Sequence, residues 1–380
     1  MPACARREIV RQGQPGIFHV SSQCVRQVFL LGIDRITGRD YNHRRQWFVD
    51  RLQLLTANFV IDIGFAAIMS NHFHLVLRTT PRLVKRMGAW EVARRWLRVY
   101  PGQRVLEGPW IEPTEEQVTA LAEDKERIAE IRKRLSSVSW FMSAVCEFIA
   151  RKANLEEGCR GRFFAGRFAC REIRSEGGLL ICGIYVDLNQ IRAGEALTPE
   201  SSLHCSVAWR IAARAKGDRG DLAASATDWL APLTLEQDQL GDVPCQSGRR
   251  ASDKGLLSVT LDEYLKLLDC VGREVRADKR GAIPAGLAPI LARLGIQSEE
   301  LVDTVEKLTQ RFQRMIGAVD EMASRAAERD DNGFKVSGTR PASLPSRIKR
   351  RLDRHPPSLL DHAIWHRGDP AQISERRAPD

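Results

Sequence analysis

Two histidines in the sequence are spaced so that they could bind one metal ion. His72 and His74 lie in the segment Asn71–Leu77 (NHFHLVL), which we predict to be a β-strand. Residues two apart on a strand point to the same face, with Cα atoms roughly 6.5 to 7 Å apart. Two imidazoles on one face supply half of a metal site, although the pattern also fits two histidines that only pack or form hydrogen bonds. His19, on an earlier predicted strand, is expected to pack or to form hydrogen bonds.

A tyrosine and an asparagine share one face of a later predicted helix. The apolar stripe of this helix recurs at helical spacing and consists of Leu180, Ile184, Leu188 and Ile191. Tyr185 and Asn189 lie four residues apart and are therefore neighbours beside the stripe. A phenol and a carboxamide placed in this way could act on one site, whereas the spacing by itself favours a half-buried tyrosine and an asparagine near the helix end. Asp187 lies about 160° round the helix from this face, so we predict that it is solvated.

A basic and aromatic stretch, Cys159–Arg171, precedes that helix. Arginine side chains bind phosphates and phenylalanine rings can stack on bases, which are the two contacts that a groove for single-stranded nucleic acid needs. The alternative is a strand with core aromatics and a solvated cationic face. The candidates for contacts to a DNA backbone are Arg160, Arg162, Arg167 and Arg171.

The composition favours a protein with a polyanionic partner. The chain has 380 residues and a net charge of +10, and nucleic acid is the first candidate for such a basic chain. The alternative is a soluble protein that is merely basic. Its N-terminal residues lack the apolar segment of a signal peptide, and the longest apolar run, 178–186, is about half of the length that spans a bilayer. Nine cysteines without a CxxC pair predict reduced thiols, so we expect a cytoplasmic protein with no membrane insertion.

The order of predicted elements indicates an α+β fold. A strand at 16–24 is followed by a helix at 41–59 and by two strands, at 59–68 and 72–78, joined by a tight connection at 69–71. This order predicts a compact antiparallel sheet with helices on one face. The further predicted elements are a helical insertion at about 81–135, a helix at 137–154 and a helix from the cap Ser175 to Gly194.

The ends of the chain and its second half are less regular. We predict a basic tail at 1–14, a catalytic domain at 15–196, a linker or loosely packed region at 197–255, and a mainly helical accessory domain at 256–329. The last segment, 330–380, is rich in Pro, Ser, Arg and His and is predicted to be a basic, partly disordered tail. Its cationic cluster consists of Arg347, Lys349, Arg350, Arg351 and Arg354.

Four blocks, in this order, resemble the HUH single-tyrosine transposases, and in particular the REP-associated tyrosine transposases. The blocks are FHVSSQCVRQVFL (18–30), MSNHFHLVL (69–77), GRFFAGRF (161–168) and YVDLNQIRAG (185–194), and some relatives also resemble the segment 262–284. The resemblance implies a ferredoxin-like or RRM-like core with the two histidines on a central strand and the tyrosine helix laid across the sheet.

The resemblance also implies a reaction. Tyr185 would be the nucleophile, and His72, His74 and Asn189 would hold Mg²⁺ or Mn²⁺. The chain would then cut and rejoin single-stranded, hairpin-flanked or repeat-end DNA through a 5′-phosphotyrosine, and the family includes homodimers as well as monomers.

The sequence departs from the family pattern at a few positions. Gln190 stands where proline is usual, Phe164 where tryptophan is common, and Gly177 and Gly178 should weaken the first turn of the tyrosine helix by roughly 1 kcal/mol each. Other readings therefore remain open. They are a transposase-derived DNA-binding protein without cleavage activity, a metal-dependent nuclease without a covalent intermediate, and a toxin-like or RNA-directed nickase.

Overall fold

The computed structural model describes residues 13–34, 37–101, 112–217, 227–235, 244–274 and 279–294. All of them belong to the first of two compact units, 1–322. Residues 323–380, with the cationic cluster at 347–354, and most of the predicted basic tail at 1–14 lie outside the described residues.

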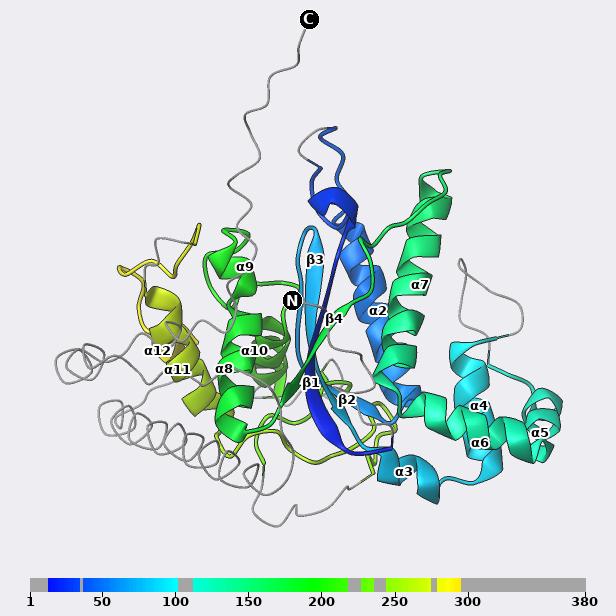
Figure 1. Ribbon diagram of the computed structural model, residues 1–380. Helices are drawn as coiled ribbons and strands as arrows, with labels where there is room; N and C mark the ends of the chain where they lie inside the picture. The colour runs from blue at the N-terminus through cyan, green and yellow to red at the C-terminus, as the bar shows by residue number, and fades with distance from the viewer. Residues whose placement is uncertain are drawn as a thin grey trace, which may run out of the picture. The chain divides into compact units, whose positions relative to one another are not determined.

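The core is a four-stranded antiparallel sheet. Its strands are β1 (Gly16–Gln23), β2 (Ile61–Ile68), β3 (His72–Thr79) and β4 (Ala169–Ile173), in the spatial order β2-β3-β1-β4 (Figure 1). Helix α2 (His43–Asn58) connects β1 to β2, and helix α7 (Val138–Glu156) precedes β4. The β1-α2-β2 unit is thus split by β3, which is the ferredoxin-like arrangement, and the predicted fold class is confirmed.

One face of the sheet packs against α2 and α7. Alternate residues of β1 and β3 point to this face because side chains alternate along a strand. The ring of Phe73 on β3 lies 5.0 Å from that of Phe48 on α2, and Phe59 lies 5.4 Å from Phe141 on α7, measured between ring centroids. The residues of β1 and β3 in this hydrophobic core are Phe18, Val20, Phe73, Leu75 and Leu77.

The second face of the sheet is also covered by helices, so the prediction of helices on one face was wrong. Helices α8 (Glu176–Asp187), α9 (Asn189–Arg192) and α10 (Ser206–Gly217) follow β4, and both α8 and α10 contact β2 (Figure 1). Every residue of β2 is buried, which requires cover on both faces of that strand. Gly183 marks a close approach of α8 to the sheet, because a Cβ at this position would lie 2.6 Å from the Phe65 ring.

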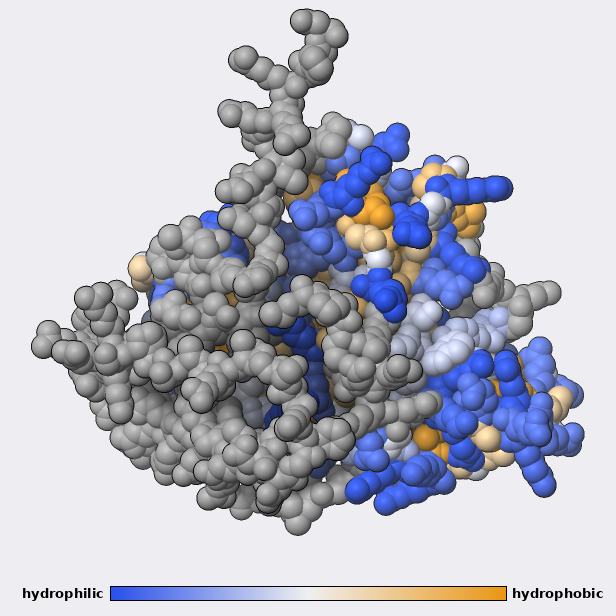
Figure 2. All heavy atoms as spheres, in the orientation of Figure 1, coloured by the Kyte–Doolittle hydropathy of each residue, from blue (hydrophilic) through white to orange (hydrophobic). Residues whose placement is uncertain are grey.

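The segment between β3 and α7 is helical, as predicted. Its described helices are α3 (Pro81–Arg86), α4 (Ala89–Val99), α5 (Glu115–Glu123) and α6 (Lys125–Leu135). Helix α4 packs against α5 and α6, with Val92, Ala93 and Ile131 buried between them. The exposed surface of these helices is mostly hydrophilic (Figure 2).

The described part of 197–255 is packed rather than loose. Cys205 forms an isolated backbone β-bridge with Ala67, and Leu230 forms one with Ile63. The segment therefore lines the outer edge of β2. The backbone N–H groups of Ala251 and Ser252 donate hydrogen bonds to the buried Asp62 carboxylate on β2. In the described part of this segment, the turn at Ala251 and Ser252 thus satisfies a buried polar group. The domain limits themselves stay a prediction.

The later helices belong to the same compact unit. Helix α11 (Leu261–Arg273) begins with a capping box formed by Thr260 and Glu263, and α12 (Ile290–Arg293) packs beside it. None of the helices in the described ranges is long and apolar enough to cross a membrane, and the cysteines in these ranges are free thiols.

The close approach at Gly183 generates the first prediction. Gly183→Ala should lower the free energy of unfolding by about 2 kcal/mol, since overpacking against the fully buried Phe65 ring costs up to about 3 kcal/mol and alanine regains about 1 kcal/mol of helix propensity. Urea unfolding measures the change. Gly166→Ala is the matched control, because a Cβ there meets no atom within 4 Å. Equal stability of Gly183→Ala and the wild type would contradict the packing described for α8.

Candidate functional site

The two histidines of β3 lie on the sheet face that carries α8. His74 pairs with Ser21 of β1 in the antiparallel register, so His19, two residues earlier on β1, points to the same face. The ring centroids of His72 and His74 are 5.0 Å apart, and those of His19 and His74 are 5.1 Å apart with the rings stacked. The predicted hydrogen-bonding role of His19 is confirmed by a contact of 3.0 Å between its Nε2 and Nδ1 of His74.

Tyr185, on α8, lies beside the His74 and His19 rings on this face of the sheet. Its ring is edge-on to His74 at 5.5 Å and to His19 at 6.2 Å, measured between ring centroids. Asn189 forms a side-chain hydrogen bond with Tyr185. The predicted single helix is interrupted at Leu188, between α8 and α9, but this interruption does not separate the two side chains. The structure therefore brings together Tyr185, Asn189, His72 and His74, whose roles as nucleophile and ligands stay predictions.

The histidine cluster favours neutral rings. Burial lowers the pKa of His72, and burial together with the nearby His72 and His19 rings holds the pKa of His74 well below its usual value. Burial, with a smaller contribution from Arg171, lowers the pKa of His19 to about 4. At neutral pH these imidazoles are therefore uncharged, which is the form that binds metal ions.

The donor set fits a divalent cation. The described residues contain no group of three or more His, Cys, Asp or Glu side chains that could hold a metal ion. The hydrogen bonds of His72 and His74 use Nδ1 in both rings, and Nε2 is the nitrogen that they do not use. Two imidazole nitrogens with the amide oxygen of Asn189 and open positions suit Mn²⁺ well and Mg²⁺ adequately.

Arg171 is the cation nearest to this site among the predicted DNA contacts. It lies on β4 directly opposite His19 in the register, with its side chain exposed. Burial raises the pKa of Tyr185, whereas the Asn189 hydrogen bond and the Arg171 charge lower it. The charge of Arg171 therefore acts on both Tyr185 and His19.

The other three predicted DNA contacts are exposed but belong to a different part of the surface. Arg160, Arg162 and Arg167 lie between α7 and β4, in a segment that pairs with the end of β1 through an isolated bridge. Of the two readings of this segment, core aromatics hold for Phe163 and Phe164, which are both buried. The Phe164 ring lies beside Phe48 and Phe73, and the Phe163 ring packs against Phe164.

The positions that depart from the family pattern have local explanations. Gln190 is buried, and its Nε2 donates a hydrogen bond of 3.1 Å to the carbonyl oxygen of Ile68 at the end of β2. Ser175 caps α8 as predicted, with its Oγ accepting a hydrogen bond from the N–H of Gly178. The first turn of the helix therefore forms despite its two glycines.

Asp187 is fully buried, so the prediction that it is solvated was wrong. Its carboxylate accepts hydrogen bonds from the Ser206 hydroxyl, from the Val207 N–H at 3.0 Å and from the Tyr264 hydroxyl at 2.7 Å. Helices α10 and α11 supply these donors and cover the side of α8 that carries Asp187. The carboxylate thereby anchors the end of α8 two residues after Tyr185.

Glu195 is a site neighbour that the sequence did not reveal. Its carboxylate accepts hydrogen bonds from the N–H and hydroxyl of Ser70 and from Nη2 of Arg45. Ser70 lies in the connection between β2 and β3, two residues before His72. An isolated glutamate after a helix end carries no local signal for this contact, which depends on the fold of α9 over the sheet.

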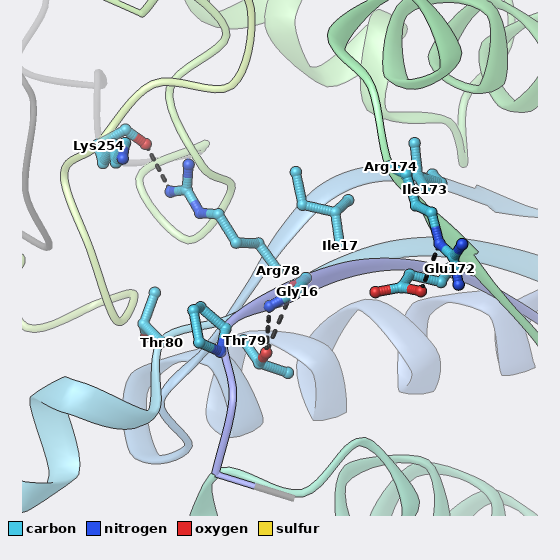
Figure 3. Close-up of a pocket in the computed structure, with 10 residues that line it drawn as sticks. Gly16, Ile17, Arg78, Thr79, Thr80, Glu172, Ile173, Arg174 and Lys254 are labelled. Carbon is cyan, nitrogen blue, oxygen red and sulfur yellow. Dashed lines mark hydrogen bonds and ion pairs between the residues drawn. The ribbon is translucent and has the colours of Figure 1, made fainter. Parts of the chain in front are cut away.

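A separate hollow of about 390 Å³ lies at the opposite end of β1 and β3 (Figure 3). Two of the arginine side chains that line it already have hydrogen-bond or ion-pair partners. Arg78 donates hydrogen bonds to the Asp62 carboxylate and to the carbonyl oxygens of Lys254 and Gly255, and Arg174 forms an ion pair with Glu172. Because the hollow lies at the other end of β1 and β3, it is distinct from the histidine and tyrosine cluster.

Neither a protein-family model nor a curated protein matches the chain. A solved structure described as "Structure of the REP associates tyrosine transposase bound to a REP hairpin" is similar at 12% sequence identity, with a TM-score of 0.27. The similarity covers 52% of this chain and 78% of that chain. A TM-score of 0.27 is too low for this likeness to bear on what the chain does.

The anchor at Asp187 generates the second prediction. Tyr264→Phe should lower the free energy of unfolding by about 1 to 3 kcal/mol, because it removes a donor from a buried carboxylate and leaves an oxygen without that partner. Urea unfolding measures the change.

Tyr41→Phe is the matched control for this prediction. The Tyr41 ring packs under Arg44, and its hydroxyl makes no hydrogen bond within the described part of the chain. We expect a change within about 0.5 kcal/mol for the control. A Tyr264→Phe protein as stable as the control would show that the Tyr264 hydroxyl does not support α8.

Proposed function

We propose that the chain is a metal-assisted DNA endonuclease and strand transferase of the single-tyrosine type. The observation that carries the proposal is the convergence of Tyr185 and Asn189, on α8 and α9, with His72 and His74, on β3, at one place over the sheet. These residues come from two segments more than a hundred positions apart. A half-buried tyrosine beside neutral imidazoles is an arrangement that nucleophilic attack on a phosphodiester can use.

The proposed reaction has one covalent step, which is reversible. Tyr185 Oη attacks the phosphorus of a DNA phosphodiester and forms a P–O bond, while the bond from phosphorus to the 3′-oxygen breaks. The phenol loses its proton, and the 3′-oxygen leaves as a hydroxyl after gaining one, so the products are a 5′-phosphotyrosine and a free 3′-end. A second 3′-hydroxyl reverses the step on another strand, and strand transfer therefore requires no external energy source.

His72, His74 and Asn189 would hold the divalent cation. When bound, Mg²⁺ or Mn²⁺ supplies Lewis-acid polarisation of the scissile phosphate. Asn189 also hydrogen-bonds to Tyr185, so one side chain would tie the position of the nucleophile to that of the cation. Arg171 stands beside the phenol and offers positive charge to the phosphate that is attacked.

The DNA partner is supported by charge. The net charge of +10 favours a polyanion, and the exposed residues Arg160, Arg162 and Arg167 lie on the segment that leads into β4 and Arg171. We infer that this segment carries the backbone of single-stranded or hairpin DNA toward the tyrosine.

The third prediction tests the covalent step. Purified protein with Mn²⁺ and labelled single-stranded hairpin DNA from the sequence flanking its own gene should give a slow, protease-sensitive band on a denaturing gel. Tyr185→Phe should abolish this band, because its side chain has no oxygen to attack phosphorus. Tyr41→Phe is the control and should form the band at the wild-type level.

Two results would overturn the proposal. Cleavage without an adduct, unchanged in Tyr185→Phe, would indicate a metal-dependent nuclease without a covalent intermediate. Tight binding of the hairpin with no cleavage by the wild type, on every flanking hairpin and with either Mg²⁺ or Mn²⁺, would indicate a DNA-binding protein.

The fourth prediction concerns Arg171. Arg171→Gln should lower the cleavage rate at saturating DNA by about ten- to a hundredfold, because a cation near the charge that develops in the transition state is lost. Arg167→Gln is the matched control, since Arg167 is also exposed but lies on the segment before β4.

The control should weaken DNA binding at low salt and leave the rate at saturating DNA within about twofold, as expected for a phosphate contact that only positions the strand. Single-turnover rates and binding isotherms separate the two effects. Equal rate losses in both variants would place Arg171 among general DNA contacts rather than beside the reacting atoms.

A further inference from the structure

We propose that Asn71 and His19 are positioning residues that set the tautomers of His72 and His74, so that both rings present Nε2 to the same cation. The proposal rests on the proposed metal site and names the residues that prepare it. Each histidine has a hydrogen bond at Nδ1, to Oδ1 of Asn71 in one case and to Nε2 of His19 in the other. Metal-binding histidines commonly donate the N–H of the other ring nitrogen to a fixed partner.

The proton on His72 follows from the partners of Asn71. The backbone carbonyl of Gln27 can only accept, so the atom of Asn71 that contacts it at 3.1 Å must be the amide nitrogen. The amide oxygen of Asn71 then faces Nδ1 of His72 at 2.7 Å, and this oxygen can only accept. Nδ1 of His72 must therefore carry the proton, and the lone pair of the neutral ring lies on Nε2.

Hydrogen bonds hold both the backbone and the side chain of Asn71. Its backbone oxygen accepts a hydrogen bond of 2.8 Å from the N–H of Cys24, in addition to the side-chain bond to Gln27. Arg26 and Gln27 both adopt left-handed backbone angles, with φ of 52° and 56°, which residues other than glycine rarely do. This unusual turn directs the Gln27 carbonyl toward Asn71, and the turn after β1 thus fixes the side chain that orients His72.

The contact between His19 and His74 sets the second tautomer. One of the two facing nitrogens must carry the shared proton, because two lone pairs would repel each other at the observed distance of 3.0 Å. If Nε2 of His19 carried it, Nδ1 of His74 would accept, and the remaining proton of His74 would occupy Nε2 and prevent metal binding. The metal site therefore requires that Nδ1 of His74 donates and that Nε2 of His19 accepts. The stacked rings, with an interplanar angle of 15°, keep this pair in register.

The first test is spectroscopic and needs neither metal nor DNA. Long-range ¹H–¹⁵N spectra of the labelled, metal-free protein distinguish the Nδ1–H from the Nε2–H form of each histidine. We expect His72 and His74 both to be Nδ1–H, with assignments from His72→Gln and His74→Gln. An Nε2–H signal for either ring would overturn the proposal, whether or not the protein cuts DNA.

The second test measures Mn²⁺ affinity by electron paramagnetic resonance. Asn71→Ala and His19→Phe should each weaken Mn²⁺ binding by about ten- to a hundredfold, the usual effect of losing an orienting partner. His19→Gln keeps an acceptor and should stay within about threefold of the wild type. Asn42→Ala is the control and should not change the affinity, since the Asn42 side chain makes no capping hydrogen bond at the start of α2.

The outcomes separate this inference from the proposed function. If His72→Gln abolishes Mn²⁺ binding but Asn71→Ala and His19→Phe do not weaken it, the positioning role is refuted while the metal site stands. If the expected tautomers and Mn²⁺ affinities are found but no covalent adduct forms, the positioning role stands while the proposed function fails. A circular dichroism melt of each variant, compared with the wild type, shows that a lost affinity is not a loss of folding.

Discussion

The position of the phenol depends on how closely α8 can approach the sheet. Gly183 allows this approach, because any Cβ at that position would overlap the ring of Phe65 on β2. Tyr185 lies two residues further along the helix and meets His74 at a centroid distance of 5.5 Å. A displacement of about 1 Å in such a geometry can cost a hundredfold in rate for an enzyme. A single methyl group, far from any reacting atom, would therefore disturb the site as much as the loss of a polar contact.

A second constraint acts at the other end of the same helix. Asp187 is buried, and among the described residues none forms an ion pair with it. A buried carboxylate is tolerated only when donors surround it. Its donors come from α10 and from Tyr264 on α11, 77 residues away in the sequence. The orientation of the tyrosine helix thus depends on helices that the sequence had assigned to a linker and an accessory domain. Whatever else these helices do, they belong to the structural support of the site.

The sequence predicted those features that depend on the regular spacing of side chains along a single strand or helix. The spacing of His72 and His74 on a strand, and of Tyr185 and Asn189 on a helix, places each pair on one face without knowledge of any other element. Arg171 could not be assigned to the phenol in this way, because its place depends on the register between β1 and β4. The place of Phe163 and Phe164 could not be assigned from the sequence either. Phenylalanine fits both a DNA-binding groove and a hydrophobic core, and only the backbone β-bridge between Cys24 and Phe164 shows that this segment turns inward.

The electrostatics of the site connect its resting state to the proposed reaction. Burial keeps the imidazoles neutral and raises the pKa of Tyr185, so that the cluster holds little charge by itself. A buried cluster without net charge avoids the desolvation penalty that a phenolate or an imidazolium would carry. A divalent cation lowers the cost of the ionised phenol, whereas the negative charge of a DNA phosphate raises it. Under the proposed function, the tyrosine would therefore become a stronger nucleophile when the cation is in place and offsets the charge of the phosphate.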